Sequence, residues 1–416
     1  MLSERLLAPF ARMTPPARTT ALRLGAVIAA AMIAMPAAGL AQEGDTPAAG
    51  TPGAGTPAAG GIPPLPASCA VVAEELINPR AITVGEDGTV YIAEAGDGGD
   101  MPDPAIVGEG TPAPAEPVTF HGDTGRVTAI SPDGERSVVV DGLTSYVFGQ
   151  ELVGPSGLAV DGDTLYVAVG GPGPFTAQID AQGDANTVIA VDLLTGEVTT
   201  LADIGAYELE TNPDPYQIDS NLGGLDLGAD GLLYVADSGG NTLYSVDPES
   251  GDLQVVAVLD GLDSGGIPNE ARRGATQSDP VPVGVVADPD GGVYVGLLTG
   301  AVTWGTPGSA EVWHVTPEGE VTVAASGLNM VVGVAVDGEG SLHATELSTN
   351  FFAGPPPAPG QVSMIGEDGT PSPIVSDLFL PYGLAFGPDG EVYVTVFASV
   401  MPGDPPAGML LSCTAE

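Results

Sequence analysis

The chain repeats one pattern of apolar and polar positions six times. Each copy begins with Gly, or with Ala in the first, alternates apolar residues, turns at an Asp-Gly or similar pair, and returns through a short apolar run that usually contains Tyr-Val. The copies span residues 81–92, 157–167, 224–235, 284–295, 333–344 and 383–394. Alternation with a period of two around a glycine-containing turn predicts a β-hairpin in every copy.

Two further apolar segments follow each hairpin. The third strands are predicted at 125–130, 186–191, 241–246, 310–315, 360–365 and 408–412, and the fourth at 137–140, 197–201, 253–259, 321–325 and 373–375. A unit of four antiparallel strands cannot bury its apolar face alone, so six consecutive units predict an all-β fold, a six-bladed β-propeller.

The sixth unit ends after its third strand, and the N-terminal segment 70–76 is predicted to supply the fourth. This pairing would close the ring and cover an open sheet edge. Cys69 opens the first of these strands and Cys413 ends the other, which predicts a disulfide between them in a secreted chain. Two buried free thiols are the alternative.

The N-terminal region has the features of an export signal and a tether. Residues 1–41 carry four arginines, then an uncharged apolar run, then a small-residue stretch ending at Ala41, which predicts a signal peptide cleaved there. An uncleaved membrane anchor is the alternative. Residues 42–66, rich in Thr, Pro, Ala and Gly, predict a flexible linker, and 67–416 the propeller. We therefore expect a secreted, periplasmic or cell-envelope exterior protein.

The charge balance limits the partners. The chain has no lysine, and five arginines remain after Ala41 against 53 acidic residues. A net charge this negative excludes nucleic acid and anionic membrane surfaces as partners. It favours cations as partners, or a need for solubility in salt.

The predicted hairpin turns share one side of the propeller, here called the turn face. The longer connections share the opposite side, the loop face, where function is expected. Second strands reach the loop face at Glu94, Asp237 and Glu346 in the odd blades, and at apolar residues in the even ones: Val169, Leu297 and Val396.

Those three acids could surround the channel mouth with Asn78, Asp219, Asn221 and Asn329. Glu94, Asp219, Asn221, Asp237 and Glu346 are candidate oxygen ligands for Ca²⁺, a hard cation that takes six to eight oxygens. The alternative is that these side chains accept hydrogen bonds from loop amides. Arg80 is expected to pair with Glu94 or to meet an anionic ligand. The three histidines, of which His121 is placed in a long loop, give no pattern typical of a Ser-His-Asp triad.

Several segments resemble a known group. Asn78-Pro-Arg-Ala-Ile-Thr-Val, Tyr91-Ile-Ala-Glu-Ala-Gly, Asp219-Ser-Asn221 and Tyr234-Val-Ala-Asp-Ser-Gly-Gly-Asn241 are similar to the ScyD/ScyE family of secreted bacterial proteins. The resemblance covers about residues 69 to 416 and implies an NHL/TolB-like propeller. It implies no particular reaction.

Two functions follow as hypotheses. The first is a secreted, monomeric, non-enzymatic propeller that binds a small ligand, a cation or an extracellular protein through its acidic loop face. The alternative is a Ca²⁺-dependent hydrolase of lactone or ester type at the channel mouth.

Overall fold

A computed structural model describes residues 64–102, 119–148, 151–172, 183–354, 357–398 and 407–415. The predicted signal peptide and almost all of the predicted linker lie outside these residues. Within the described part of the chain, no helix is both long enough and apolar enough to span a membrane.

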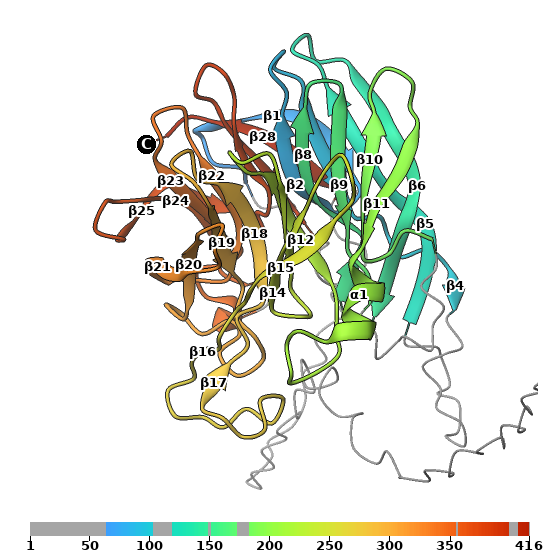
Figure 1. Ribbon diagram of the computed structural model, residues 1–416. Coiled ribbons are helices and arrows are strands. Elements are labelled where there is room, and N and C mark those ends of the chain that lie inside the picture. The colour runs from blue at the N-terminus through green and yellow to red at the C-terminus, as the bar shows by residue number, and fades with distance from the viewer. Residues whose placement is uncertain are drawn as a thin grey trace, which may run out of the picture. The chain divides into compact units, whose positions relative to one another are not determined.

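The described chain folds into a six-bladed β-propeller, which confirms the predicted fold class (Figure 1). The first strands of the blades are β2 (Pro79–Val84), β8 (Pro155–Asp161), β12 (Leu222–Leu227), β18 (Pro282–Ala287), β22 (Val331–Val336) and β26 (Leu384–Phe386). The second strands are β3 (Val90–Glu94), β9 (Thr164–Val169), β13 (Leu233–Asp237), β19 (Val293–Leu297), β23 (Leu342–Glu346) and β27 (Val392–Val396). Each of these pairs is antiparallel.

The outer halves of the blades are also antiparallel. The third strands are β5 (Thr119–Ile130), β10 (Thr187–Asp192), β14 (Thr242–Val246), β20 (Ala310–Val315), β24 (Gly360–Ile365) and β28 (Gly408–Cys413). The fourth strands are β6 (Arg136–Phe148), β11 (Val198–Asp203), β15 (Leu253–Val258), β21 (Val321–Leu328), β25 (Pro371–Leu378) and β1 (Cys69–Leu76).

The first strands pack against one another in a ring, and the repeat glycine lies where neighbouring strands approach most closely. A Cβ atom on Gly224 would lie 2.6 Å from the backbone nitrogen of Val285 and 2.7 Å from the carbonyl oxygen of Val283 in the next blade. The same crowding by the next blade's first strand occurs at Gly157, Gly284 and Gly383, and Gly333 is crowded by Tyr382 just before β26. The absent side chain is therefore what allows the blades to meet.

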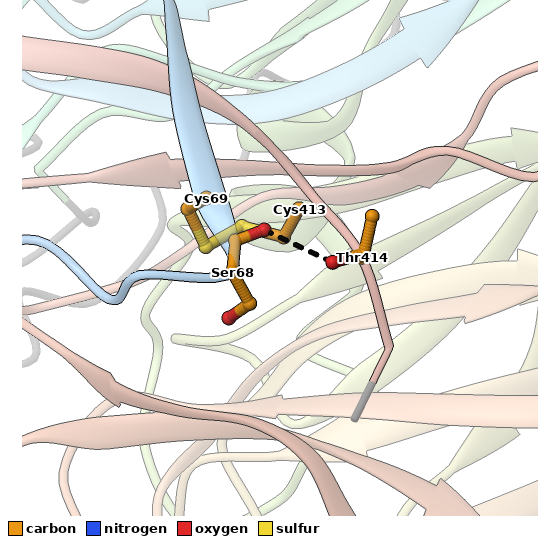
Figure 2. Close-up of a disulfide and its surroundings, with 4 residues drawn as sticks. All are labelled: Ser68, Cys69, Cys413 and Thr414. Carbon is orange, nitrogen blue, oxygen red and sulfur yellow. Dashed lines mark hydrogen bonds between the residues drawn. A yellow bond between two sulfur atoms is a disulfide. The ribbon is translucent and has the colours of Figure 1, made fainter.

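The ring closes as predicted. Strand β1 pairs with β28, with Cys69 opposite Cys413, and a disulfide joins the two cysteines (Figure 2). Thr414 adds a hydrogen bond from its backbone nitrogen to the carbonyl oxygen of Ser68, at 2.9 Å. Glu75 in β1 has a φ of 58°, and Gly142 at the equivalent place in β6 has a φ of 74°. β1 therefore shares with β6, the fourth strand of blade 1, a residue of positive φ at the equivalent position.

Three connections contain structure that the sequence pattern did not predict. β5 begins at Thr119, so His121 lies in a strand and not in a loop, and blade 1 gains β4 (Met101–Pro102) and β7 (Glu151–Val153). The crossover to blade 3 contains helix α1 (Ile204–Thr211), capped by the Asp203 side chain, which accepts from the backbone nitrogen of Ala206. The crossover to blade 4 contains the short hairpin β16 (Leu262–Asp263) and β17 (Gln277–Ser278). Figure 1 shows both crossovers on the same side of the ring.

Candidate functional site

The three acids of the odd blades end their second strands, as predicted, but they are buried. Glu94 and Asp237 are 0% exposed and Glu346 is 1% exposed. Val169, Leu297 and Val396, at the same place in the even blades, are also fully buried. Carboxylates and apolar side chains thus occupy equivalent interior positions around the ring.

Each of these acids accepts a hydrogen bond from a backbone N–H group just before the first strand of its own blade. Ile77 N lies 2.5 Å from Glu94 Oε2, and Asn221 N lies 2.8 Å from Asp237 Oδ1. Asn329 N lies 2.9 Å from Glu346 Oε2. A carboxylate is a strong acceptor for an amide that the sheet leaves unpaired. The acids therefore hold each crossover against its blade. Their role is to accept hydrogen bonds from loop amides, which was the alternative to Ca²⁺ binding.

Glu94 is saturated by cationic and hydroxyl donors. Arg126 Nε and Nη2 bind its two oxygens at 2.8 Å each, and Thr128 Oγ1 donates to Oε1. Arg136 adds a longer ion pair at 3.5 Å. The expected pair between Arg80 and Glu94 is wrong, because Arg126 is directly opposite Glu94 in the register of β3 and β5.

Arg80 is buried at the start of β2. Its Nη2 donates to the carbonyl oxygen of Leu152 at 2.8 Å, and its guanidinium carbon lies 4.4 Å from the ring centroid of Tyr382 in the adjacent blade. This stacking fixes the arginine between blades 1 and 6.

Glu346 is saturated by neutral donors. Asn329 Nδ2 donates to Oε2 at 2.5 Å, while Gln361 Nε2 and Ser363 Oγ donate to Oε1 at 2.7 and 2.8 Å. With the backbone N–H of Asn329, four donors surround this buried carboxylate. Neither Glu94 nor Glu346 therefore has a free oxygen toward the loop face.

Asp237 differs from the other two acids. Its Oδ1 accepts from three backbone N–H groups, those of Asn221, Gly239 and Gly240, at 2.8 to 3.1 Å. Its Oδ2 has no hydrogen-bond partner, although it is fully buried. Burial raises the pKa of Asp237, and the backbone N–H groups and the nearby Ser220 hydroxyl only partly oppose this rise. The Ser220 hydroxyl does not meet the carboxylate at hydrogen-bonding geometry.

Two further acids were not predicted as site residues: Glu208 interacts electrostatically with Asp237, and Asp214 interacts with Glu208. Burial and, to a smaller extent, the Asp237 carboxylate raise the pKa of Glu208 in α1 to about 7. Tyr244 OH contacts Glu208 Oε2 at 3.2 Å. Burial also raises the pKa of Asp214, which accepts from Asn241 Nδ2 at 2.9 Å. We call Glu208, Asp214 and Asp237 the blade 3 acid cluster. Glu208 and Asp214 lie in a non-repeating crossover, so periodicity could not find them.

The structure does not bring the five predicted Ca²⁺ ligands together. Glu94, Asp237 and Glu346 lie in alternate blades, and each is bonded within its own blade. Only Asp219, Asn221 and Asp237 are neighbours, across the start of β12 and the end of β13. Among the described residues, no group of three or more His, Cys, Asp and Glu side chains is arranged to hold a metal ion.

The loop face also carries an aromatic patch, defined as Trp304, Phe351 and Phe352. Trp304 lies in the connection between β19 and β20, and the two phenylalanines begin the short 3₁₀-helix Phe351–Ala353 after β23. The ring centroid of Trp304 lies 4.6 Å from that of Phe351 and 5.5 Å from that of Phe352. Phe351 packs into a core cluster with Val283 and Tyr382, whereas Phe352 is 57% exposed. Phe352 is therefore the member of the aromatic patch that presents most apolar surface to solvent.

Comparison with known proteins supports the fold alone. No protein-family model and no curated protein matches the chain. A solved protein of unknown function from Bacteroides thetaiotaomicron has a TM-score of 0.50 at 12% identity, over 82% of this chain and 75% of that one. A gluconolactonase from Xanthomonas campestris has a TM-score of 0.47 at 14% identity, over 83% and 89%. A streptogramin B lyase has a TM-score of 0.44 at 13% identity, over 83% and 97%.

Proposed function

We propose that this chain is a secreted propeller that binds an extracellular ligand through its loop face and carries out no reaction of its own. The observation that carries the proposal is that two of the three odd-blade acids serve as structural hydrogen-bond acceptors. Glu94 and Glu346, which could have served as catalytic or metal-binding carboxylates, are buried and fully bonded within the scaffold. Groups that are already saturated cannot bind a substrate without breaking the crossovers that they hold.

The aromatic patch supports a binding role. Its two connections, 299–309 and 348–354, contain no acidic residue, although the chain as a whole is strongly acidic. An exposed phenylalanine next to a half-buried tryptophan offers a large contact area at low entropic cost, as binding hot spots do. We infer that the ligand presents an apolar or aromatic group to this patch, while the surrounding negative potential favours cationic ligands.

A peptide library displayed on phage tests this proposal. We expect the mature chain to select basic peptides with aromatic residues, and the double variant Trp304→Ala/Phe352→Ala to lose them. Val323→Ala is the control, because Val323 is exposed on β21 in an outer strand. Selected peptides that bind all three proteins equally, or no selection at all, would contradict a binding role for the patch.

The Ca²⁺-dependent hydrolase is the second candidate. The unpaired Oδ2 of Asp237 favours it, because a buried carboxylate oxygen without a donor can accept a cation. Hydrolysis of an aliphatic lactone and of an aryl acetate, measured with Ca²⁺ and with chelator, separates the two functions. Turnover that requires Ca²⁺ and is lost in Asp237→Asn would replace the binding proposal with the hydrolase.

Secretion and membership of the ScyD/ScyE family belong to the same proposal. The disulfide supports export, because such bonds persist in oxidising compartments. The motifs around Glu94 and Asp237 support the family. Intact mass measurement of the exported protein should give a chain that begins after Ala41 and has no free thiol; a mass that retains residues 1–41 would favour the anchor.

A further inference from the structure

Two buried oxygens in blade 3 have no hydrogen-bond partner. They are Oδ2 of Asp237, at the end of β13, and Oγ of Ser220, just before β12. Both residues are 0% exposed. Leaving a buried polar oxygen unpaired costs about 1–3 kcal/mol. The Ser220 hydroxyl is a nearby donor that partly opposes the rise that burial causes in the pKa of Asp237, but the two groups do not meet at hydrogen-bonding geometry, which leaves both oxygens available to a third atom.

A backbone carbonyl oxygen approaches Asp237 Oδ2 beside Gly240. A Cβ atom on Gly240 would lie 3.1 Å from Asp237 Oδ2 and 3.1 Å from the carbonyl oxygen of Asp219. The two oxygens therefore approach the same point beside Gly240 from different segments, and a side chain at residue 240 would crowd both of them. Gly240 has no positive φ, so its backbone conformation does not explain the glycine.

The charge around this point is negative and uncompensated. Glu208 is also 0% exposed, and its carboxylate interacts electrostatically with that of Asp237. No Arg or His forms an ion pair with Glu208 or Asp237 among the described residues, whereas Glu94 has Arg126. Arg272 forms its ion pair with Asp279, at 2.7 Å, and only partly opposes the rise that burial causes in the pKa of Asp214. Burial raises the pKa of both carboxyl groups, so a proton or a cation is needed to neutralise them where they lie.

We propose that a Ca²⁺ ion binds in blade 3 to Asp237 Oδ2, Ser220 Oγ and the carbonyl oxygen of Asp219, with the Glu208 carboxylate supplying a second negative charge. The ligands are all oxygens and come from a carboxylate, a hydroxyl and a backbone carbonyl, a set that suits Ca²⁺ when waters complete its shell. This site is local to one blade, unlike the channel-mouth site expected from the sequence, and it needs neither Glu94 nor Glu346.

The ion would link the segment 219–221 to the turn between β13 and β14. That link would stabilise the loop face of blade 3 by binding the folded state only. The site does not depend on the aromatic patch, which lies on blades 4 and 5. The proposal of Ca²⁺ binding and the proposal of ligand binding at the aromatic patch can therefore be tested independently.

The test uses the mature, disulfide-bonded chain after removal of metals with chelator. Thermal unfolding is measured in physiological salt with and without millimolar CaCl₂ or MgCl₂, and Tb³⁺ luminescence excited through tyrosine reports direct binding, since Tyr244 contacts Glu208. We expect Ca²⁺ to raise Tm more than Mg²⁺ and to displace Tb³⁺.

Three variants locate the site. Asp237→Asn removes the charge, and Gly240→Ala crowds this point without changing any ligand atom. Both should weaken Ca²⁺ binding by at least about tenfold. Glu346→Gln, the matched acid of blade 5, changes a carboxylate whose oxygens are all bonded, and it should keep the Ca²⁺ response. If Asp237→Asn does not fold, Gly240→Ala decides the result.

The proposal is overturned if Ca²⁺ raises Tm no more than Mg²⁺ does, or if Gly240→Ala binds Tb³⁺ as well as the unaltered chain. Equal shifts in every variant would indicate general screening of the acidic surface. Trp304→Ala/Phe352→Ala should leave Ca²⁺ binding unchanged, so failure of the patch proposal is distinguishable from failure of this one.

Discussion

Asn329 donates both its backbone N–H and its side-chain amide to one oxygen, Oε2 of Glu346, at 2.9 and 2.5 Å. The residue just before β22 is thus fixed to the residue that ends β23. Ile77 and Asn221 make the corresponding backbone contact to Glu94 and Asp237. We call this arrangement a clamp: a buried carboxylate at the end of the second strand binds the segment that leads into the first strand. The clamp accounts for the acids in the interior of three blades.

Removal of the Glu346 clamp should destabilise the propeller. Glu346→Ala leaves the donors of Asn329, Gln361 and Ser363 unpaired, so we expect a loss of about 3 kcal/mol in the free energy of unfolding. Urea denaturation measures it. Glu367→Ala is the control, because Glu367 is exposed in a turn, and it should change stability little. Equal effects in both variants would contradict the clamp.

A side chain at the repeat glycine should separate the inner strands. The Cβ of Gly224→Ala would press on the backbone of Val283 and Val285, so we expect a loss of about 1–3 kcal/mol. Gly338→Ala is the matched control, since a Cβ there meets no atom within 4 Å and the φ is not positive. Thermal unfolding of the two variants compares them, and an equally stable Gly224→Ala would disprove the close approach.

The disulfide should stabilise the ring by restricting the unfolded chain. It joins residues 344 apart, so its removal in Cys69→Ala/Cys413→Ala should cost on the order of 5 kcal/mol or less. The β1–β28 pairing stays available, so the variant should keep its β-sheet circular dichroism spectrum. Urea denaturation of the unaltered chain with reductant should match the double variant. A midpoint that reductant does not change would contradict a stabilising disulfide.

Glu208 should make stability fall as pH rises. Its folded-state pKa of about 7 lies above the ordinary value of 4.5, so between these values the folded chain keeps a proton that the unfolded chain has released. The folded state then binds more protons, and stability decreases with pH through this window. Glu208→Gln should flatten that part of the profile, whereas Glu210→Gln, exposed in the same helix, should not. Urea denaturation from pH 4 to 8 in metal-free buffer, about the window between the two pKa values, measures both. Identical slopes in all three proteins would rule out Glu208 as the cause.

Local pattern predicted most of the scaffold. Alternation and glycine turns place the second strands and the ring closure through β1, because strand periodicity and turn geometry depend on adjacent residues. It did not predict α1 or the β16–β17 hairpin, which occur once each in crossovers of different length. A segment without repetition offers no pattern to compare.

The sequence by itself determined six blades, the order of their strands, the Cys69–Cys413 pairing and three acids at equivalent positions. Only the tertiary structure decided what each acid does. Glu94 meets Arg126 instead of Arg80, Glu346 is saturated by Asn329 and its neighbours, and Asp237 keeps one oxygen unpaired. The physical reason is that the role of a carboxylate depends on the hydrogen-bond donors that surround it. Cross-strand register and crossovers bring these donors from positions distant in the sequence, and those positions follow no repeat.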